Sequence, residues 1–418
     1  MRGWERLEPF PRWAMGCLPS PKGRAAVFLV ILLGVSVPPE SCLSASESCS
    51  TPSSEQDAAM ELAEQLRLQS AEPELLASWK SERRESVCSW DGIDCDRNCS
   101  VVELFLGRRR TGRTLRGQML SPSWLARFSS LSALFMKGTM LTGELPSGYS
   151  ALQQLREVAV GNGLSGTLPP GWSALTRLIY LDLSENIALS GTLPPEYSNL
   201  RHLQTLLLSS TLLGGPLPPE WSALEALDTL DIAYAAVTGR LPPEWSHLSR
   251  TLVELNLRGN LLASTLPAEY SAMGGLNQLL LDDNNLEGSL PTEWHTLSGL
   301  KILDLSNNKI TGTIPQSWSS MTNLERLSLH GNSLSYCGEA SAAMDLPENI
   351  VEALSAASTV QVDPLNTAQN CPRAARSIVP WLLLGVLLPC VATTVLFVLG
   401  VIIHRITCHN PSCIHRHP

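Results

Sequence analysis

The sequence is poor in charge: Asp, Glu, Lys and Arg make up only 17% of its 418 residues, and the formal net charge is −9. Proteins that bind nucleic acids need a basic patch or stripe to neutralise phosphates. The one dense basic run is Arg108, Arg109, Arg110 and Arg113, and a run this short is more often a solvated loop than a binding surface. The composition therefore argues against a nucleic-acid partner.

The sequence also lacks a constellation of residues that would support catalysis. His202, His247, His295 and His330 have no Cys, Ser or Glu partner at the spacing that nucleophilic catalysis requires. A G-x-G-x-x-G match at residues 161–166 is not followed by the helix that a dinucleotide site needs. We therefore expect a protein that is not an enzyme and has no cofactor.

What the sequence has in abundance is a repeat. The phrase LPPEWSAL (residues 217–224) returns as LPPEWSHL (residues 241–248), and a Leu-Pro or Ile-Pro step recurs at positions 145, 168, 193, 217, 241, 266, 290 and 314. A period of 23 to 25 residues indicates a solenoid, in which only the stack of coils buries a core.

One repeat, residues 300–321, shows the parts of a coil. Leu303 and Leu305 alternate with Asp304 and Ser306, and this period of two predicts a short strand. Asn308 then ends the strand at a turn. The predicted fold is α/β: a right-handed leucine-rich-repeat solenoid with a parallel sheet on the concave face and short 3-10 or irregular segments on the convex side, plus one C-terminal transmembrane helix.

Three columns recur from coil to coil, with three interruptions. Thr211 and Ala235 interrupt the Asn column and Ser264 interrupts the Gly column, so we expect slightly weaker packing there, although Thr211 can still donate one hydrogen bond. The Asn column reads Asn162, Asn186, Asn260, Asn284, Asn308 and Asn332; the Gly column reads Gly143, Gly166, Gly191, Gly215, Gly239, Gly288 and Gly312; the aromatic column reads Trp124, Tyr149, Trp172, Tyr197, Trp221, Trp245, Tyr270, Trp294 and Trp318.

Both ends of the chain carry apolar segments. Residues 25–37 are apolar, follow a basic stretch and are too short to span a bilayer, which predicts a signal peptide over residues 1–45. Residues 378–403 are uncharged and long enough to span. A glycolipid-anchor signal is the alternative, but it would end on the apolar tail, whereas residues 404–418 follow. We expect a single-pass type I plasma-membrane protein with its repeats outside and residues 404–418 inside.

The segments flanking the repeats (residues 111–336) are predicted to close the ends of the stack. Residues 46–110 contain apolar positions at helical spacing, Met60, Leu62, Leu66 and Leu68, followed by a cysteine-rich stretch. Such a helix with a small disulfide loop would cover the first coil. Residues 337–377 are interpreted as the closing cap and a short stalk.

The order Asp57, Trp79, Cys88-x-Trp90-x-Gly92-x-x-Cys95 resembles the N-terminal cap of plant-type extracellular leucine-rich-repeat proteins. The PPEWS phrase is more similar still to the promastigote surface antigen family of trypanosomatid parasites. This resemblance covers roughly residues 56–336 and implies an extracellular recognition domain held at the cell surface. The short connector and apolar span depart from the stalk and lipid anchor common in that family.

The resemblance also implies a disulfide between Cys88 and Cys95. We infer a second between Cys337 and Cys371, which flank the closing cap, leaving Cys49 with Cys99; a zinc site at Cys88, Cys95 and Cys99 is the alternative. Asn98 begins the one N-x-S/T glycosylation match. After the apolar span, Cys408 and Cys413 are candidates for palmitoylation. The alternatives are a plain disordered tail and a metal site formed with the neighbouring histidines.

The remaining candidate site is the concave face, where strand positions are not needed for the core. Acidic residues there alternate with apolar ones, a mixture that suggests a protein or glycan partner. We expect a surface protein that binds such an extracellular ligand in adhesion or host interaction; the alternative is a structural coat protein without a specific ligand. The predicted binding residues are Tyr180, Asp182, Leu207, Asp231, Asn256, Arg258, Leu280, Asp282, Asp304 and Ser328.

Overall fold

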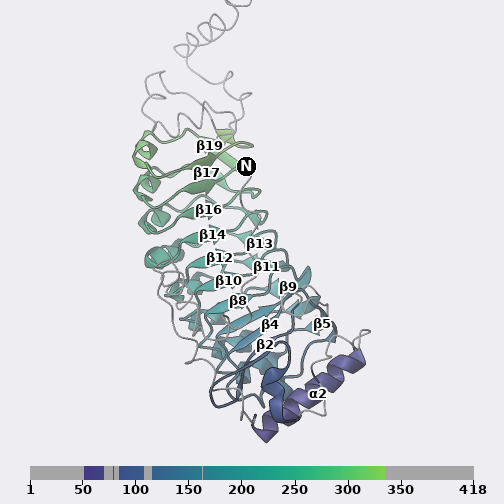
Figure 1. The fold of residues 1–418 in the computed structure, drawn as a ribbon. Coiled ribbons are helices and arrows are strands. Elements are labelled where there is room, and N and C mark those ends of the chain that lie inside the picture. The colour runs from purple at the N-terminus through teal and green to yellow at the C-terminus, as the bar shows by residue number, and fades with distance from the viewer. Residues whose placement is uncertain (1–50, 70–78, 80–83, 108–114, 162, 335–418) are drawn as a thin grey trace, which may run out of the picture.

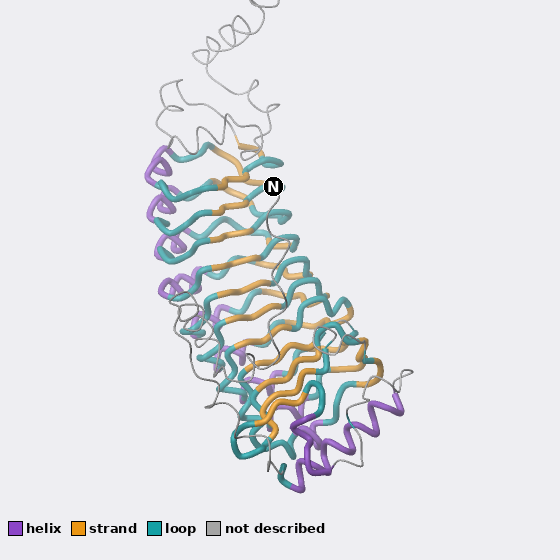
Figure 2. The backbone as a smooth tube through the Cα atoms, viewed as in Figure 1, coloured by secondary structure: helices purple, strands orange, loops and turns teal. Residues whose placement is uncertain are grey.

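The computed structural model describes residues 51–69, 79, 84–107, 115–161 and 163–334. These residues form one curved stack of coils, with a helix across one end (Figure 1). Strands run along one face and short helical turns along the opposite one (Figure 2). The predicted solenoid is therefore confirmed.

The inner face of the stack is an eleven-stranded sheet. Its first pair is antiparallel and every later pair is parallel, with leucines in register, such as Leu206 opposite Leu230. In order, its strands are β1 (Ile93–Cys95), β2 (Val101–Phe105), β4 (Ala133–Met136), β6 (Glu157–Val160), β8 (Tyr180–Asp182), β10 (Thr205–Leu207), β12 (Thr229–Asp231), β14 (Glu254–Asn256), β16 (Gln278–Leu280), β18 (Ile302–Asp304) and β20 (Arg326–Ser328). The sheet thus already begins within the segment predicted as a cap.

A second layer of parallel strands, which the sequence did not predict, follows the turn at the end of each inner strand. Seven strands form one sheet: β3 (Arg116–Gln118), β5 (Met140–Glu144), β7 (Leu164–Thr167), β9 (Ala188–Thr192), β11 (Leu212–Pro216), β13 (Ala236–Gly239) and β15 (Leu261–Leu262). Three more form another: β17 (Glu287–Ser289), β19 (Lys309–Gly312) and β21 (Ser333–Leu334).

The break between these two outer sheets lies at Ser264, where the Gly column is interrupted. The glycines of the column have φ between 76° and 104°, a left-handed conformation that costs a residue with a Cβ atom about 1–2 kcal/mol. Ser264 does not adopt it, and a single bridge, Thr265 to Glu287, crosses the gap. Leu262 and Leu286 are nevertheless fully buried. The interruption thus acts on the continuity of the outer sheet, and the weaker packing stays a prediction.

The convex side consists of short 3-10 helices, as predicted. They are η5 (Ser147–Ala151), η6 (Pro170–Ala174), η7 (Pro195–Asn199), η8 (Pro219–Ala223), η9 (Pro243–Arg250), η10 (Ala268–Ala272), η11 (Thr292–Thr296) and η12 (Gln316–Ser320), preceded by the short helix α4 (Pro122–Leu125). Each 3-10 helix buries the aromatic residue of its coil, whereas Trp124 in α4 is only partly buried.

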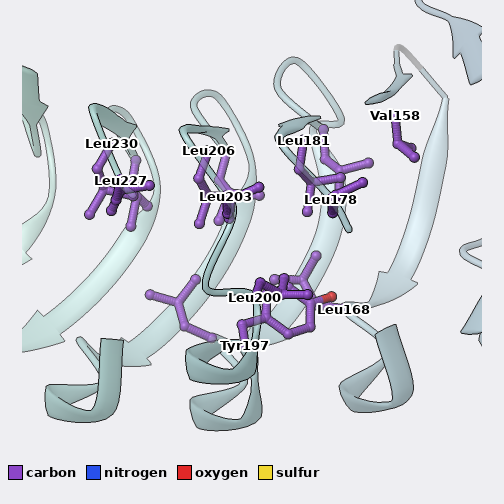
Figure 3. Packing of buried hydrophobic residues seen from close by; sticks show 14 of the residues in the cluster. Val158, Leu168, Leu178, Leu181, Tyr197, Leu200, Leu203, Leu206, Leu227 and Leu230 are labelled. Carbon is purple, nitrogen blue, oxygen red and sulfur yellow. The ribbon is translucent and has the colours of Figure 1, made fainter. Parts of the chain in front are cut away.

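Aromatic and leucine side chains fill the interior between the sheets and the 3-10 helices. Leucines from successive coils stack on one another behind the inner sheet, and Tyr197 packs below them with Leu200 (Figure 3). Trp221 and Trp245 lie parallel, with ring centroids 6.5 Å apart. The same buried environment thus repeats in every coil.

The tryptophans also connect coils through hydrogen bonds. Trp245 Nε1 donates to the carbonyl oxygen of Pro218, in the preceding coil, at 2.9 Å. Equivalent bonds are made by Trp172, Trp221, Trp294 and Trp318 to Pro146, Pro194, Pro267 and Pro291. Each of these carbonyls also accepts from a backbone amide of its own 3-10 helix, such as Trp221 to Pro218 at 3.2 Å. The tryptophan of the recurring PPEW phrase thus adds a second hydrogen bond that ties its coil to the preceding one.

The asparagine column performs the same task at the turns. Asn284 Nδ2 donates to the carbonyls of Leu281, in its own coil, and Leu257, in the preceding coil, while its Oδ1 accepts from the Leu262 amide. Thr211 keeps only the bonds within its own coil, as expected. Asn162 lies outside the described residues.

The N-terminal cap is built around helix α2 (Ser53–Gln69), as predicted, with the 3-10 helix η4 (Arg84–Ser89) after it. Leu62 and Leu66 of α2 are fully buried. The Glu55 carboxylate is buried and accepts from the Val101 amide at 2.9 Å, which fixes the helix to β2. Cys88 and Cys95 form a disulfide, which excludes the zinc site considered for them. Cys99 is also disulfide-bonded.

Several predictions concern residues outside the described part: the signal peptide, the apolar span, the tail with Cys408 and Cys413, Cys49, and the Cys337–Cys371 pair. Within the described part, no helix is long and apolar enough to cross a membrane.

Loss of an indole donor should destabilise the stack. Trp245→Phe leaves the Pro218 carbonyl with the Trp221 amide as its one remaining donor, at 3.2 Å. The loss of the indole hydrogen bond is expected to lower the free energy of unfolding by about 0.5–1.5 kcal/mol, plus a cavity cost. The matched control is Tyr270→Phe, because the buried Tyr270 hydroxyl has no hydrogen-bond partner; this change should be neutral or stabilising. Urea unfolding of both variants measures the difference, and equal losses would contradict the role given to the indole.

Candidate functional site

The inner sheet brings all ten predicted binding residues onto one face, spread from β8 to β20. Tyr180 and Asp182 lie on β8, Leu207 on β10 and Asp231 on β12, with the others on β14 to β20 or just after them. Their exposure differs from the expectation. Asp182 and Asp282 are buried, and Leu207 and Leu280 are half-buried rather than exposed.

Asp182 is buried because Lys137 covers it. Lys137 follows β4 and reaches across the intervening β6 coil, so that its Nζ lies 2.6 Å from Asp182 Oδ2. Tyr180 and Ser184 donate hydroxyl hydrogen bonds to the same carboxylate. Gly161 makes this route possible, since a Cβ atom there would lie 3.3 Å from Lys137 Cγ. The result is a neutralised polar cluster toward the N-terminal end of the face.

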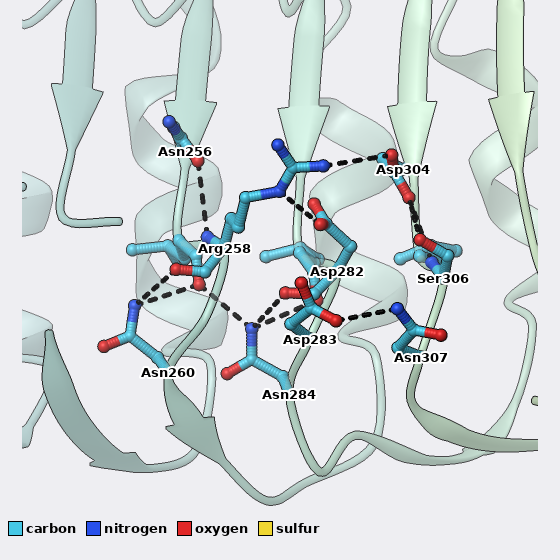
Figure 4. A network of polar contacts seen from close by, with 12 residues as sticks. Asn256, Arg258, Asn260, Asp282, Asp283, Asn284, Asp304, Ser306 and Asn307 are labelled. Carbon is cyan, nitrogen blue, oxygen red and sulfur yellow. Dashed lines mark hydrogen bonds and ion pairs between the residues drawn. The ribbon is translucent and has the colours of Figure 1, made fainter. Parts of the chain in front are cut away.

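A second cluster centres on Arg258, two residues after β14 (Figure 4). The Arg258 guanidinium hydrogen-bonds Asp282 and lies 3.7 Å from Asp304 Oδ2. Asp304 in turn accepts from the Ser306 hydroxyl at 2.6 Å. Burial raises the pKa of Asp282, and Arg258 works against that rise. One cation thus holds two carboxylates from the next two strands in fixed positions.

Asp231 lies between the two clusters and has no cation of its own. It forms no ion pair within the described residues, although its Oδ1 accepts from the Ala233 amide at 2.9 Å. Desolvation by burial raises its pKa, and hydrogen bonds from Ala233, Ser209 and Asn256 only partly offset this. Asp231 is therefore a carboxylate whose charge the protein does not neutralise.

The prediction missed two features nearer the N-terminus. Lys137 was not recognised as part of the face, and neither were Phe105 and Phe135, whose half-buried rings stack with centroids 4.6 Å apart. Both phenylalanines occupy the middle position of the strand pattern, the position of Asp182 in β8. The L-x-L strand pattern reads Leu104-Phe105-Leu106 in the first of these coils and Leu134-Phe135-Met136 in the next, with Met136 in place of the second leucine. Extending the pattern to these two coils would have identified both phenylalanines.

The polar clusters of the inner face lie apart from one another along the sheet. Among the described residues, no group of three His, Cys, Asp or Glu side chains could hold a metal ion. Ser328 lies on β20, beyond the Arg258 cluster, and the Lys137 and Arg258 clusters are separated by β10 and β12. The inner face is thus a long, curved surface on which polar and apolar side chains alternate.

Comparison with known proteins agrees with the fold. A family model for leucine-rich repeats matches residues 274–334, and a model for the leucine-rich-repeat N-terminal domain matches residues 54–96. No curated protein sequence matches the chain. The chain thus carries leucine-rich repeats behind a leucine-rich-repeat N-terminal domain, which confirms the plant-type cap.

Solved structures of plant ectodomains are similar. The ectodomain of the Arabidopsis thaliana receptor kinase GASSHO1/SCHENGEN3 shares 31% identity and a TM-score of 0.61 over 66% of this chain and 33% of that one. The peptide hormone receptor RGFR1 shares 27% identity and a TM-score of 0.53, over 59% of this chain and 46% of that one. This chain therefore spans less than half the length of either receptor.

A plant ice-binding protein is matched over its whole length and over 78% of this chain, with 23% identity and a TM-score of 0.59. That similarity concerns the fold alone. Taken together, the chain has the leucine-rich-repeat ectodomain fold of plant receptors, and the resemblance to a parasite surface antigen stays a prediction.

The pKa of Asp231 predicts how stability depends on pH. A carboxyl whose pKa is raised on folding binds its proton more tightly in the native state, so its contribution to stability falls as pH rises through the interval between its unfolded and its raised folded pKa. Asp231→Asn should therefore be more stable than the parent at pH 7, with a smaller difference at pH 4. Urea unfolding at both pH values measures this, and a variant less stable at pH 7 would contradict it.

Proposed function

We propose that this chain is a cell-surface binding protein whose inner sheet face takes up an extracellular protein or peptide ligand. The observation that carries the proposal is the face itself: strands β2 to β20 present side chains that the core does not use, and two ion-paired clusters hold several of them in fixed positions. Pre-organised polar groups beside half-buried apolar ones are the features of a specific interface.

The similar receptors support the choice of a polypeptide ligand. The GASSHO1/SCHENGEN3 ectodomain was solved in complex with CASPARIAN STRIP INTEGRITY FACTOR 2, and RGFR1 in complex with RGF2. Their ectodomains share the coil architecture described above. A glycan ligand is the second candidate, favoured by the alternation of half-buried rings, such as Phe105 and Tyr180, with hydroxyl and carboxylate groups.

The placement of the protein is part of the proposal. We infer that residues 1–45 direct secretion and that residues 378–403 anchor the chain, with the repeats outside and Cys408 and Cys413 available for palmitoylation. Exposed Asn98 begins the glycosylation match on the cap. In this setting the protein acts as an adhesin or surface antigen, as the promastigote surface antigen resemblance implies. The competing proposal is a coat protein that uses the stack as a spacer.

A binding experiment separates these two proposals. Random twelve-residue peptides displayed on phage are selected against the purified full-length chain, and the enriched peptides are then synthesised and titrated. Saturable, competable binding is expected. Substituting Asp231, Asn256 and Leu280 together by alanine should weaken it at least about tenfold.

The matched control changes three exposed glutamates of the convex side, Glu196, Glu220 and Glu293, to alanine and should leave the affinity unchanged. Circular dichroism confirms that both variants stay folded. Binding that is not saturable would support the coat protein, and binding that is lost in the convex variant but retained in the inner-face variant would overturn the proposed site.

A further inference from the structure

The large apolar side chains exposed in the described part of the chain all lie in one row. Each is within one residue of the Asn-column position, which Thr139 holds in the coil of Met140 and bonds as Thr211 does. The row thus follows the turn where an inner strand leads into the second layer of strands. We call this row the apolar rim; its members are Met140, Ile187, Leu212, Tyr234 and Leu261, between 49% and 75% exposed.

The apolar rim is not an extension of the core. The residues that face inward next to it, Leu141, Leu213 and Leu262, are already buried, so the rim side chains add nothing to the interior. The row also ends abruptly, because the next coils place Asn285, Lys309 and Ser333 directly after the Asn-column position, where Met140, Ile187, Leu212 and Leu261 lie in the earlier coils. Exposed apolar side chains on nearby coils, interrupted at Gly163, mark an interaction site.

Tyr234 places an aromatic ring on the rim from a left-handed turn position. Its φ is 52°, in the left-handed region, where a bulky side chain is unfavourable, yet its ring is 55% exposed. The ring lies over the next coil: a Cβ atom on Gly259 would be only 2.5 Å from Tyr234 Cδ1. The left-handed conformation itself belongs to the repeat, since Glu185, Ser210, Asp283 and Asn307 adopt it at the same position of their coils. What distinguishes Tyr234 is an aromatic ring held over the next coil and left more than half exposed, which suits contact with a partner.

The inner face beside the rim is strongly acidic. Strands β8 to β18 and the turns that follow them carry seven acidic residues and one basic residue, Arg258, and Lys137 adds a second cation from β4. Both cations are engaged with Asp182, Asp282 and Asp304. Asp231 and Glu254 form no ion pair within the part of the chain that the structure describes. The surplus charge is therefore negative at the centre of the face.

We propose that the apolar rim and the acidic centre of the inner face together form the docking surface for a cationic polypeptide segment. Aliphatic or aromatic side chains of the segment pack on Leu212, Tyr234 and Leu261, while its Lys or Arg side chains meet Asp231 and Glu254. The charge excludes anionic partners such as nucleic acid or acidic lipid surfaces. This inference rests on the proposed function and deepens it, because it states the chemistry of the ligand and adds the rim to the site.

The displayed peptides selected against the full-length chain provide the test. Enriched peptides should carry net positive charge and at least one large apolar residue, and their affinity should fall as ionic strength rises. Replacing Leu212 and Leu261 by serine should weaken binding at least about tenfold without loss of stability, because both side chains are exposed. The matched control changes the same position in the later coils, Asn285→Ser with Ser333→Ala, and should bind as the parent does.

Two further variants separate the parts of the surface. Tyr234→Asn should raise or preserve the melting temperature, since Asn tolerates the left-handed region, and still weaken binding. Asp231→Asn with Glu254→Gln should weaken binding and reduce its dependence on salt.

Each outcome decides between the two proposals. Enrichment of neutral or acidic peptides, or full affinity in the Leu212/Leu261 variant, would overturn the inference while inner-face binding, and with it the proposed function, survives. An absence of saturable binding to the parent chain would instead reject both.

Discussion

The structure depends on the pairing of buried backbone groups between one coil and the next. Each turn of a solenoid leaves carbonyl and amide groups in the interior that its own short strands cannot satisfy, and an unpaired buried group costs about 1–3 kcal/mol. Asparagine side chains at the strand ends supply missing partners, and tryptophan indoles on the convex side add a second donor to carbonyls of the preceding coil. The apolar core can continue from coil to coil because the side chains of these columns hydrogen-bond backbone groups that would otherwise be buried without enough partners.

The same stacking sets up the inner face. Parallel strands in register place equivalent positions of neighbouring coils side by side, so a residue on one coil meets residues one or two coils away. Lys137 reaches Asp182, and Arg258 reaches Asp282 and Asp304, along this direction. Ion pairs of this kind order the face without contributing to the core. They also leave Asp231 as an uncompensated carboxylate, a cost to folding that is reasonable where a ligand supplies the opposite charge.

The second layer of strands gives the molecule its rim. Most of these short strands contain the left-handed glycine of their coil in their second half, such as Gly191 in β9 and Gly239 in β13. The apolar rim lies along the start of the strands. Ser264 ends the longer outer sheet, and the apolar character of the rim ends at the same place, with Leu261. The N-terminal and central coils therefore differ from the last three in surface as well as in sheet continuity.

The sequence by itself determined the repeat, the inner strands and the buried aromatic column, because each coil meets the same environment and so repeats the same residue types at the same spacing. The helical cap followed from its own apolar spacing, and the Cys88–Cys95 pair was implied by the resemblance to plant-type caps. The sequence also identified which strand positions face the core and which lie on the open inner face. Only the tertiary structure decided that Asp182 and Asp282 are buried, that Phe105 and Phe135 stack, that a second layer of strands exists and that the exposed apolar residues form one row. These features depend on side chains from different coils meeting in space, and the spacing within one coil carries no record of which of them will meet.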